Sequence, residues 1–105
     1  MRIDPEAVGA WEIETFMAGA YRLEVPKDGR PTARELAMPG DDRNGDPVEL
    51  LAWGRFDELT GLGPGITVGQ SMLLVLTTEI DRGTYATRVV GPVVHILEDR
   101  PRSWR

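Results

Sequence analysis

The strongest constraint on the fold lies in the last third of the chain, where two runs rich in β-branched and aliphatic residues flank a short polar connection. Residues 71–80 read SMLLVLTTEI and residues 84–97 read TYATRVVGPVVHIL, with Asp-Arg-Gly at 81–83 between them. β-Branched residues are enriched in strands, and two such runs around a turn signal predict a β-hairpin. Because proline cannot donate a hydrogen bond to a ladder, the Gly-Pro pair at 91–92 predicts a bulge, a corner or an edge position.

Residues 11–56 contain a second set of strand signals. Residues 11–15 and 21–25 each alternate between apolar and polar side chains, which favours two strands, although the apolar residues of this region also fit a helical stripe. Residues 26–31 contain Asp-Gly, which supports a positive φ and predicts a turn. Residues 48–56 (VELLAWGRF) are typical of a strand with apolar side chains on both faces.

The remaining segments are short or rich in turn residues. Residues 4–6 (Asp-Pro-Glu) have the pattern of a helix start, so a short helical turn is expected there. Residues 32–38 have no clear period and fit either a return strand or a helical turn. Residues 39–47 are predicted to form an acidic loop, and residues 60–65 a glycine-rich loop.

Together these signals predict a mainly β chain with about five or six strands and at most one short N-terminal helix. Chains of this kind close into small barrels or fold as sandwiches, and the Gly-Pro corner favours a small antiparallel β-barrel, in which strands bend sharply between sheets. The length of 105 residues predicts one domain, 1–105. Within it, residues 39–47 are expected to be a mobile acidic loop and residues 99–105 a C-terminal tail.

One set of residues resembles the β-barrel second domain of translation GTPases. The set comprises residues 53–56 (Trp-Gly-Arg-Phe), residues 65–70 (Gly-Ile-Thr-Val-Gly-Gln), Thr87 and residues 89–93 (Val-Val-Gly-Pro-Val). That domain has a strand beginning with Gly-Arg, then a segment of the form Ile-x-Val-Gly and a later Thr-x-Val-x-Gly-Ile. The resemblance implies a barrel, and we assign no family from it.

Composition limits the compartment and the chemistry. The sequence has no cysteine, which excludes disulfides, thiolate metal ligands and a cysteine nucleophile. We find no apolar signal-peptide segment, and the longest apolar run, residues 72–76, is too short to cross a membrane. We therefore expect a cytoplasmic protein, or a particle assembled in the cytoplasm, without membrane association. The net charge is −5, and its acidic excess falls within residues 1–60, which argues against nucleic acid as a partner.

No segment carries a recognisable catalytic motif. The glycine-rich stretch at 62–66 lacks the lysine and the following helix of a phosphate-binding loop, so it is expected to be an ordinary loop leading into a strand. The acidic loop lacks the ligand spacing of an EF-hand. Glu12 and Glu14 are expected on the solvated face of a strand, opposite Trp11 and Ile13, rather than across a cleft.

His95 is the single histidine, and strand alternation places it on one face with Val93 and Leu97. It has no partner histidine or cysteine for a metal. A Ser-His-acid triad is formally open through Ser71 or Ser103, but neither serine lies in a nucleophile-elbow pattern. We therefore predict that the chain is not an enzyme and holds no metal or cofactor, and a small enzyme that uses His95 is the alternative.

The C-terminal tail is the most suggestive segment for binding. Arginine and tryptophan are the residue types of interface hot spots, and the tail carries both. The predicted partner-binding residues are Arg100, Arg102, Trp104 and Arg105.

We therefore expect a non-enzymatic interaction or assembly module that binds a protein partner or itself, such as a subunit of a phage or bacterial particle. The alternative is a ligand-binding or single-stranded nucleic-acid-binding barrel of the OB type. The surface for that alternative would use Arg55, Phe56, Tyr85, Arg88 and His95.

Overall fold

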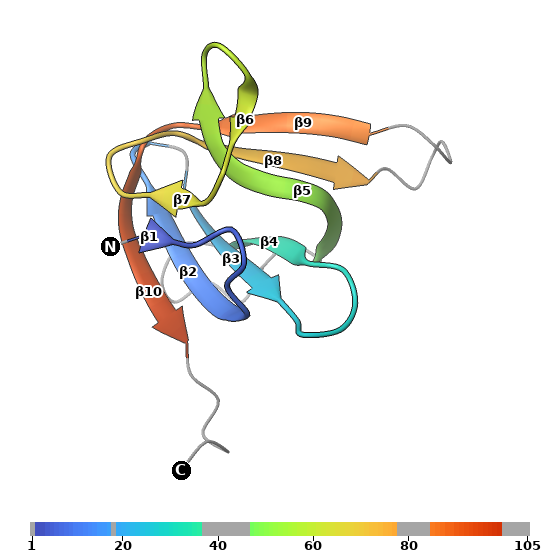
Figure 1. Cartoon of the computed structure of the whole chain (residues 1–105). Coiled ribbons are helices and arrows are strands. Elements are labelled where there is room, and N and C mark those ends of the chain that lie inside the picture. Colours follow the sequence, from blue (N-terminus) through green and yellow to red (C-terminus); the bar gives the residue numbers. More distant parts are fainter. Residues whose placement is uncertain (1, 18, 37–46, 78–84, 100–105) are drawn as a thin grey trace.

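The computed structural model describes residues 2–17, 19–36, 47–77 and 85–99, and all of the regular structure in these ranges is β-strand (Figure 1). The strands are β1 (Arg2–Ile3), β2 (Gly9–Thr15), β3 (Ala20–Val25), β4 (Thr32–Leu36), β5 (Val48–Asp57), β6 (Gly61–Gly63), β7 (Ile66–Thr67), β8 (Met72–Thr77), β9 (Tyr85–Val90) and β10 (Val93–Asp99). Every pairing between them is antiparallel. Within the same ranges, no helix could span a membrane.

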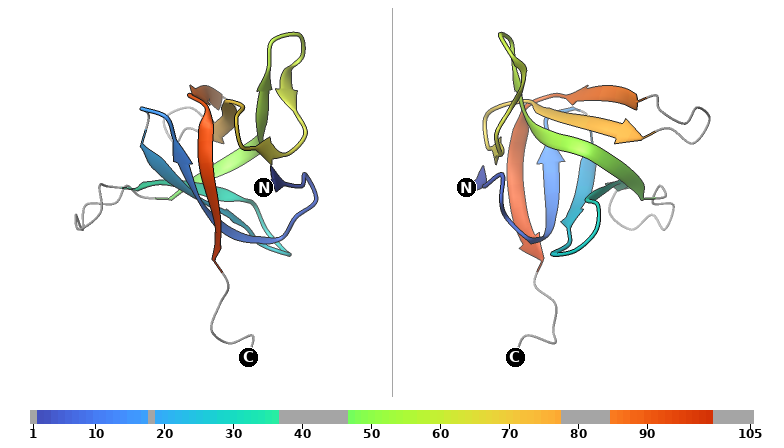
Figure 2. Two further views of the ribbon diagram at one scale, coloured as in Figure 1. Left: turned by 90° about the vertical axis from the view of Figure 1, so that its left-hand side faces the viewer. Right: turned by 45° about the vertical axis from the view of Figure 1, so that its right-hand side comes forward.

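The strands form one curved sheet and one small ribbon. The strand order in the sheet is β10-β2-β3-β4-β5-β8-β9, and β6 pairs with the end of β5. β1 and β7 form the separate two-stranded ribbon. Figures 1 and 2 show that β8 and β9 run across the direction of β2 and β10, so the curved sheet wraps around its own inner face.

The sheet does not close into a barrel within the described residues. β9 and β10 follow one another through Gly91 and Pro92 but pair with different neighbours, β8 and β2. The predicted corner at Gly-Pro is therefore confirmed. The predicted closed barrel is not, because the corner turns β10 away from β9 and no ladder joins these two ends of the sheet.

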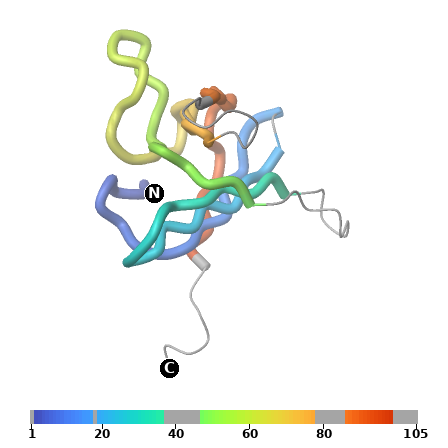
Figure 3. Tube along the Cα trace, turned by 90° about the vertical axis from the view of Figure 1, so that its right-hand side faces the viewer, coloured from blue at the N-terminus to red at the C-terminus, as the bar shows by residue number. Residues whose placement is uncertain are grey.

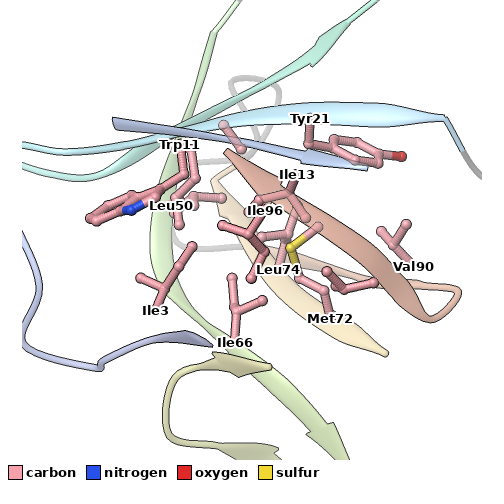
Figure 4. Packing of buried hydrophobic residues seen from close by; sticks show 13 residues of the cluster. Ile3, Trp11, Ile13, Tyr21, Leu50, Ile66, Met72, Leu74, Val90 and Ile96 are labelled. Carbon is pink, nitrogen blue, oxygen red and sulfur yellow. The ribbon is translucent and has the colours of Figure 1, made fainter. Parts of the chain in front are cut away.

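The hydrophobic core fills the inner face of the curved sheet (Figure 4). In β2, Trp11 and Ile13 are buried while Glu12 and Glu14 are exposed, which confirms the predicted alternation. The core draws on strands from both halves of the chain. Its most deeply buried side chains are Ile3, Ile13, Leu23, Leu50, Ile66, Met72, Leu74, Val90 and Val93.

Most of the predicted strands are confirmed. The ambiguous region at 11–25 contains two strands, β2 and β3, and the segment from residue 32 is a return strand, β4. The hairpin predicted in the last third is present as β8 paired with β9. The Asp-Gly turn connects β3 to β4, and Gly29 has a φ of 106° there.

Two local predictions need correction. The described residues contain ten strands rather than five or six, because short strands such as β1, β6 and β7 have too few residues to leave a periodic signal. Part of the glycine-rich loop is strand, since Gly61–Gly63 pairs with the end of β5. At residues 4–6, where a short helical turn was expected, the chain makes a hydrogen-bonded turn. In this turn the Ala7 N–H donates to the Asp4 carbonyl over 3.0 Å.

Three predicted segments lie outside the described residues. They are most of the acidic loop (residues 39–46), the Asp-Arg-Gly connection at 81–83, and the tail from residue 100.

Candidate functional site

The end of β5 and the whole of β6 form a hairpin that projects from the sheet, and we call residues 55–63 the arm (Figures 1 and 3). Arg55, Phe56 and Asp57 of β5 pair with Gly63, Leu62 and Gly61 of β6. On its other edge, the ladder of β5 with β8 ends at Arg55, whose partner is Met72, and one further backbone bond runs from the Phe56 N–H to the Ser71 carbonyl over 2.8 Å. The arm projects because the chain continues the strand beyond the point where the sheet supports it.

The turn at the tip of the arm is held by one carboxylate. Asp57 Oδ1 accepts hydrogen bonds from the backbone N–H of Leu59 (2.8 Å) and of Thr60 (3.3 Å). These two bonds, with a smaller contribution from the charge of Arg55, hold the pKa of Asp57 below its ordinary value. Gly61 follows with a φ of 85°, a conformation that glycine adopts without steric cost. The tip therefore has a defined shape and carries a negative charge at neutral pH.

The base of the arm is fixed by close backbone contact. A Cβ atom added at Gly54 would overlap the carbonyl oxygen of Gly63. The Arg55 side chain lies against Gly63, where an added Cβ would come within 2.7 Å of its Nε. Arg55 Nη1 also donates to the carbonyl of Pro64 over 3.2 Å. Glycine at both positions lets the two strands and the arginine stem pack this closely.

The arm exposes apolar side chains on a defined backbone. Leu59 at the tip is 96% exposed, and Phe56 and Leu62, which are cross-strand partners, are 38% and 39% exposed. A single exposed leucine is ordinary on a protein surface. Three apolar side chains on one projecting hairpin, beside the acidic Asp57 and Glu58, form a contact surface suited to a protein partner.

A pocket of about 180 Å³ opens at the other end of β5, and we call it the mouth. Arg88 and Glu35 lie on its rim, where Arg88 Nη1 is 3.7 Å from Glu35 Oε2. Both of these side chains are at least half exposed. The mouth is lined by Tyr21, Ala33, Glu35, Val48, Leu74, Leu76 and Arg88.

A second hollow, of about 410 Å³, is lined by the single turn of residues 4–7. One exposed turn provides few converging groups, so the mouth is the better candidate for binding despite its smaller volume.

The residues predicted for an OB-type surface are not gathered into one patch. Arg55 and Phe56 are successive residues of one strand, so they point to opposite faces of the arm. Arg88 lies on the rim of the mouth, and His95 is exposed on β10. Tyr85 is the first residue of β9. The structure therefore places these residues in at least three separate regions.

Strand alternation predicted that His95 and Val93 share a face, and the structure shows that they do not. The register between β10 and β2 shifts between Val93 and His95, so Val93 is buried while His95 is exposed opposite Glu14. The irregularity inserts one residue, and one residue is enough to reverse the face of a strand. His95 lines neither of the two pockets above. In the described part of the chain, no group of three or more His, Cys, Asp or Glu side chains could hold a metal ion.

Sequence reasoning missed the arm as a candidate site. It assigned Arg55 and Phe56 to an OB-type surface, and it placed residues 60–65 in a loop. The available signal was an aspartate followed three and four residues later by Thr-Gly, which is a turn pattern. The four tail residues predicted to bind a partner lie outside the described residues, so their role stays a prediction. Comparisons with family models, with curated proteins and with solved structures found no match to this chain.

Proposed function

We propose that this chain is a non-enzymatic interaction or assembly module that binds a protein partner through the arm. The observation that carries the proposal is Leu59, an almost fully exposed leucine at the tip of a hairpin whose turn and base are both held in place. A preformed hairpin loses little conformational entropy on binding, so burial of its apolar side chains contributes directly to affinity.

The charge of the arm supports a protein partner over a nucleic acid. Asp57 and Glu58 immediately precede Leu59 in the sequence, and the lowered pKa of Asp57 keeps that carboxylate ionised at neutral pH. Two acidic groups at the tip would repel phosphates. The absence of cysteine from the sequence is in keeping with assembly in the cytoplasm.

The proposal is tested by placing a photoreactive residue, p-benzoylphenylalanine, at Leu59 of the full chain in the cell that produces it. Met17 is the matched control position, because it is 90% exposed and lies in a turn away from the arm. We expect a cross-linked protein adduct from Leu59 and at most a weak one from Met17. If irradiation gives no adduct at Leu59, with any protein including the chain itself, the proposal is wrong.

A further inference from the structure

The arm and the mouth lie at the two ends of one strand. Val48, which lines the mouth, is the first residue of β5, and Asp57, which holds the turn of the arm, is the last. The nine residue steps from Val48 to Asp57 span up to about 30 Å along the strand. Figures 1 and 2 show the arm directed away from the body of the sheet. The arm of a molecule therefore cannot fill the mouth of the same molecule.

The mouth matches the tip of the arm in size and polarity. Its interior is apolar, with Tyr21 and Leu74 buried and Leu76 half-buried. Its volume is about 180 Å³. An apolar cavity of about 150 Å³ is large enough to hold benzene, so the four-carbon side chain of a leucine fits.

The rim of the mouth also offers one cation to the acidic tip of the arm. Asp57 and Glu58 precede Leu59 in the arm, and the rim of the mouth carries the guanidinium of Arg88 beside the carboxylate of Glu35. A guanidinium has five N–H donors, and the contact of Arg88 with Glu35 is long, at 3.7 Å. Arg88 can therefore bind a carboxylate of an incoming arm while Leu59 enters the apolar interior.

We propose that the partner of the arm is a second copy of this chain, with Leu59 of one copy seated in the mouth of the next and Glu58 paired with Arg88. This inference rests on the function proposed above and names the partner. Each copy presents one arm and one mouth on different surfaces, so the contact is heterologous. Repeated contacts of this kind generate a ring where the rotation closes and a filament where it does not.

The test is sedimentation equilibrium of the full chain from about 10 μM to about 1 mM. A contact built on one hairpin is smaller than the roughly 1,200–2,000 Å² of a standard interface and therefore binds weakly. We expect the mass to rise above the 11.6 kDa monomer. Leu59→Asp and Arg88→Glu should each weaken association by roughly 10- to 100-fold. Met17→Asp, the matched control outside the arm and the mouth, should associate as the unmodified chain does. Far-ultraviolet circular dichroism of each variant verifies that it is folded.

Mixing the two defective variants gives the decisive measurement. The Leu59→Asp chain keeps its mouth and the Arg88→Glu chain keeps its arm, so an equimolar mixture should form a complex of twice the monomer mass and nothing larger. The proposal is overturned if the unmodified chain stays monomeric up to about 1 mM, if Leu59→Asp associates normally, or if the mixture stays monomeric.

The photocross-linking at Leu59 separates this inference from the proposed function. An adduct between two copies, mapped to Val48, Leu74 or Leu76, supports both. An adduct with a different protein, together with a monomeric purified chain, overturns the self-association and retains the interaction module. The absence of any adduct overturns both.

Discussion

Gly65 is a position where a single added methyl group should be costly, because two independent constraints meet there. The residue lies between β6 and β7, is buried, and has a φ of 77°, in the left-handed region that favours glycine. A Cβ added at Gly65 would lie 2.6 Å from the carbonyl oxygen of Ile3 and 3.6 Å from Cδ of Pro5. The contact with Ile3 is with backbone, which cannot move aside as a flexible side chain can.

The cost of Gly65→Ala can be estimated from these two terms. A non-glycine residue in the left-handed region costs about 1–2 kcal/mol, and forcing an extra methyl group into packed structure costs about 1–3 kcal/mol more. We therefore expect the free energy of unfolding to fall by about 2–5 kcal/mol. That is a large fraction of the roughly 5–15 kcal/mol typical of a whole domain.

Gly69→Ala is the matched control, because Gly69 also has a positive φ, of 95°, but an added Cβ would meet nothing within 4 Å. Gly69→Ala should lower the free energy of unfolding by the cost of the left-handed backbone conformation alone, about 1–2 kcal/mol. Thermal unfolding followed by circular dichroism measures the difference, and Gly65→Ala should melt at least about 4 °C below Gly69→Ala. Equal melting temperatures for the two variants would refute the steric argument, and with it the close approach of Gly65 to β1.

Three further outcomes are expected. As pH falls through the lowered pKa of Asp57, protonation removes the negative charge that strengthens its two hydrogen bonds. Amide protection of Leu59 and Thr60, measured by hydrogen exchange, should therefore be present above the ordinary value of 3.8 and lost at lower pH. Met72→Ala should lower the free energy of unfolding by about 2–5 kcal/mol in urea titrations, because the side chain is fully buried. A chain ending at Glu98 should associate like the full chain in sedimentation, whereas a monomeric product would place the assembly contact in the tail.

The strands were predictable where side-chain alternation alone determines them. β2 is the clearest case, because Trp11 and Ile13 face the core while Glu12 and Glu14 face solvent. The corner at Gly91 is of the same kind, since glycine followed by proline interrupts a ladder whatever surrounds it. Local physical chemistry sufficed for these features.

The features that sequence reasoning missed depend on distant pairing. The face of His95 is reversed by one irregularity in the register against β2, and nothing local to β10 specifies it. The arm is a second example, because it projects only where β5 continues past the end of its ladder with β8, at Arg55. Whether the sheet closes likewise depends on where β10 finds a partner after the corner.

The structure separates the residues that hold the fold from those proposed to make the contact. Leu59 is 96% exposed, so Leu59→Asp removes almost no buried surface and should change stability by no more than about 0.5 kcal/mol. Gly65 lies outside the arm and lines neither pocket, so its substitution acts on folding. Because the two effects fall on different residues, lost association in Leu59→Asp at unchanged melting temperature reports on the contact itself. The hairpin is held at its turn and at its base while Leu59 contributes almost nothing to the core, which is why we propose that it makes a contact outside its own chain.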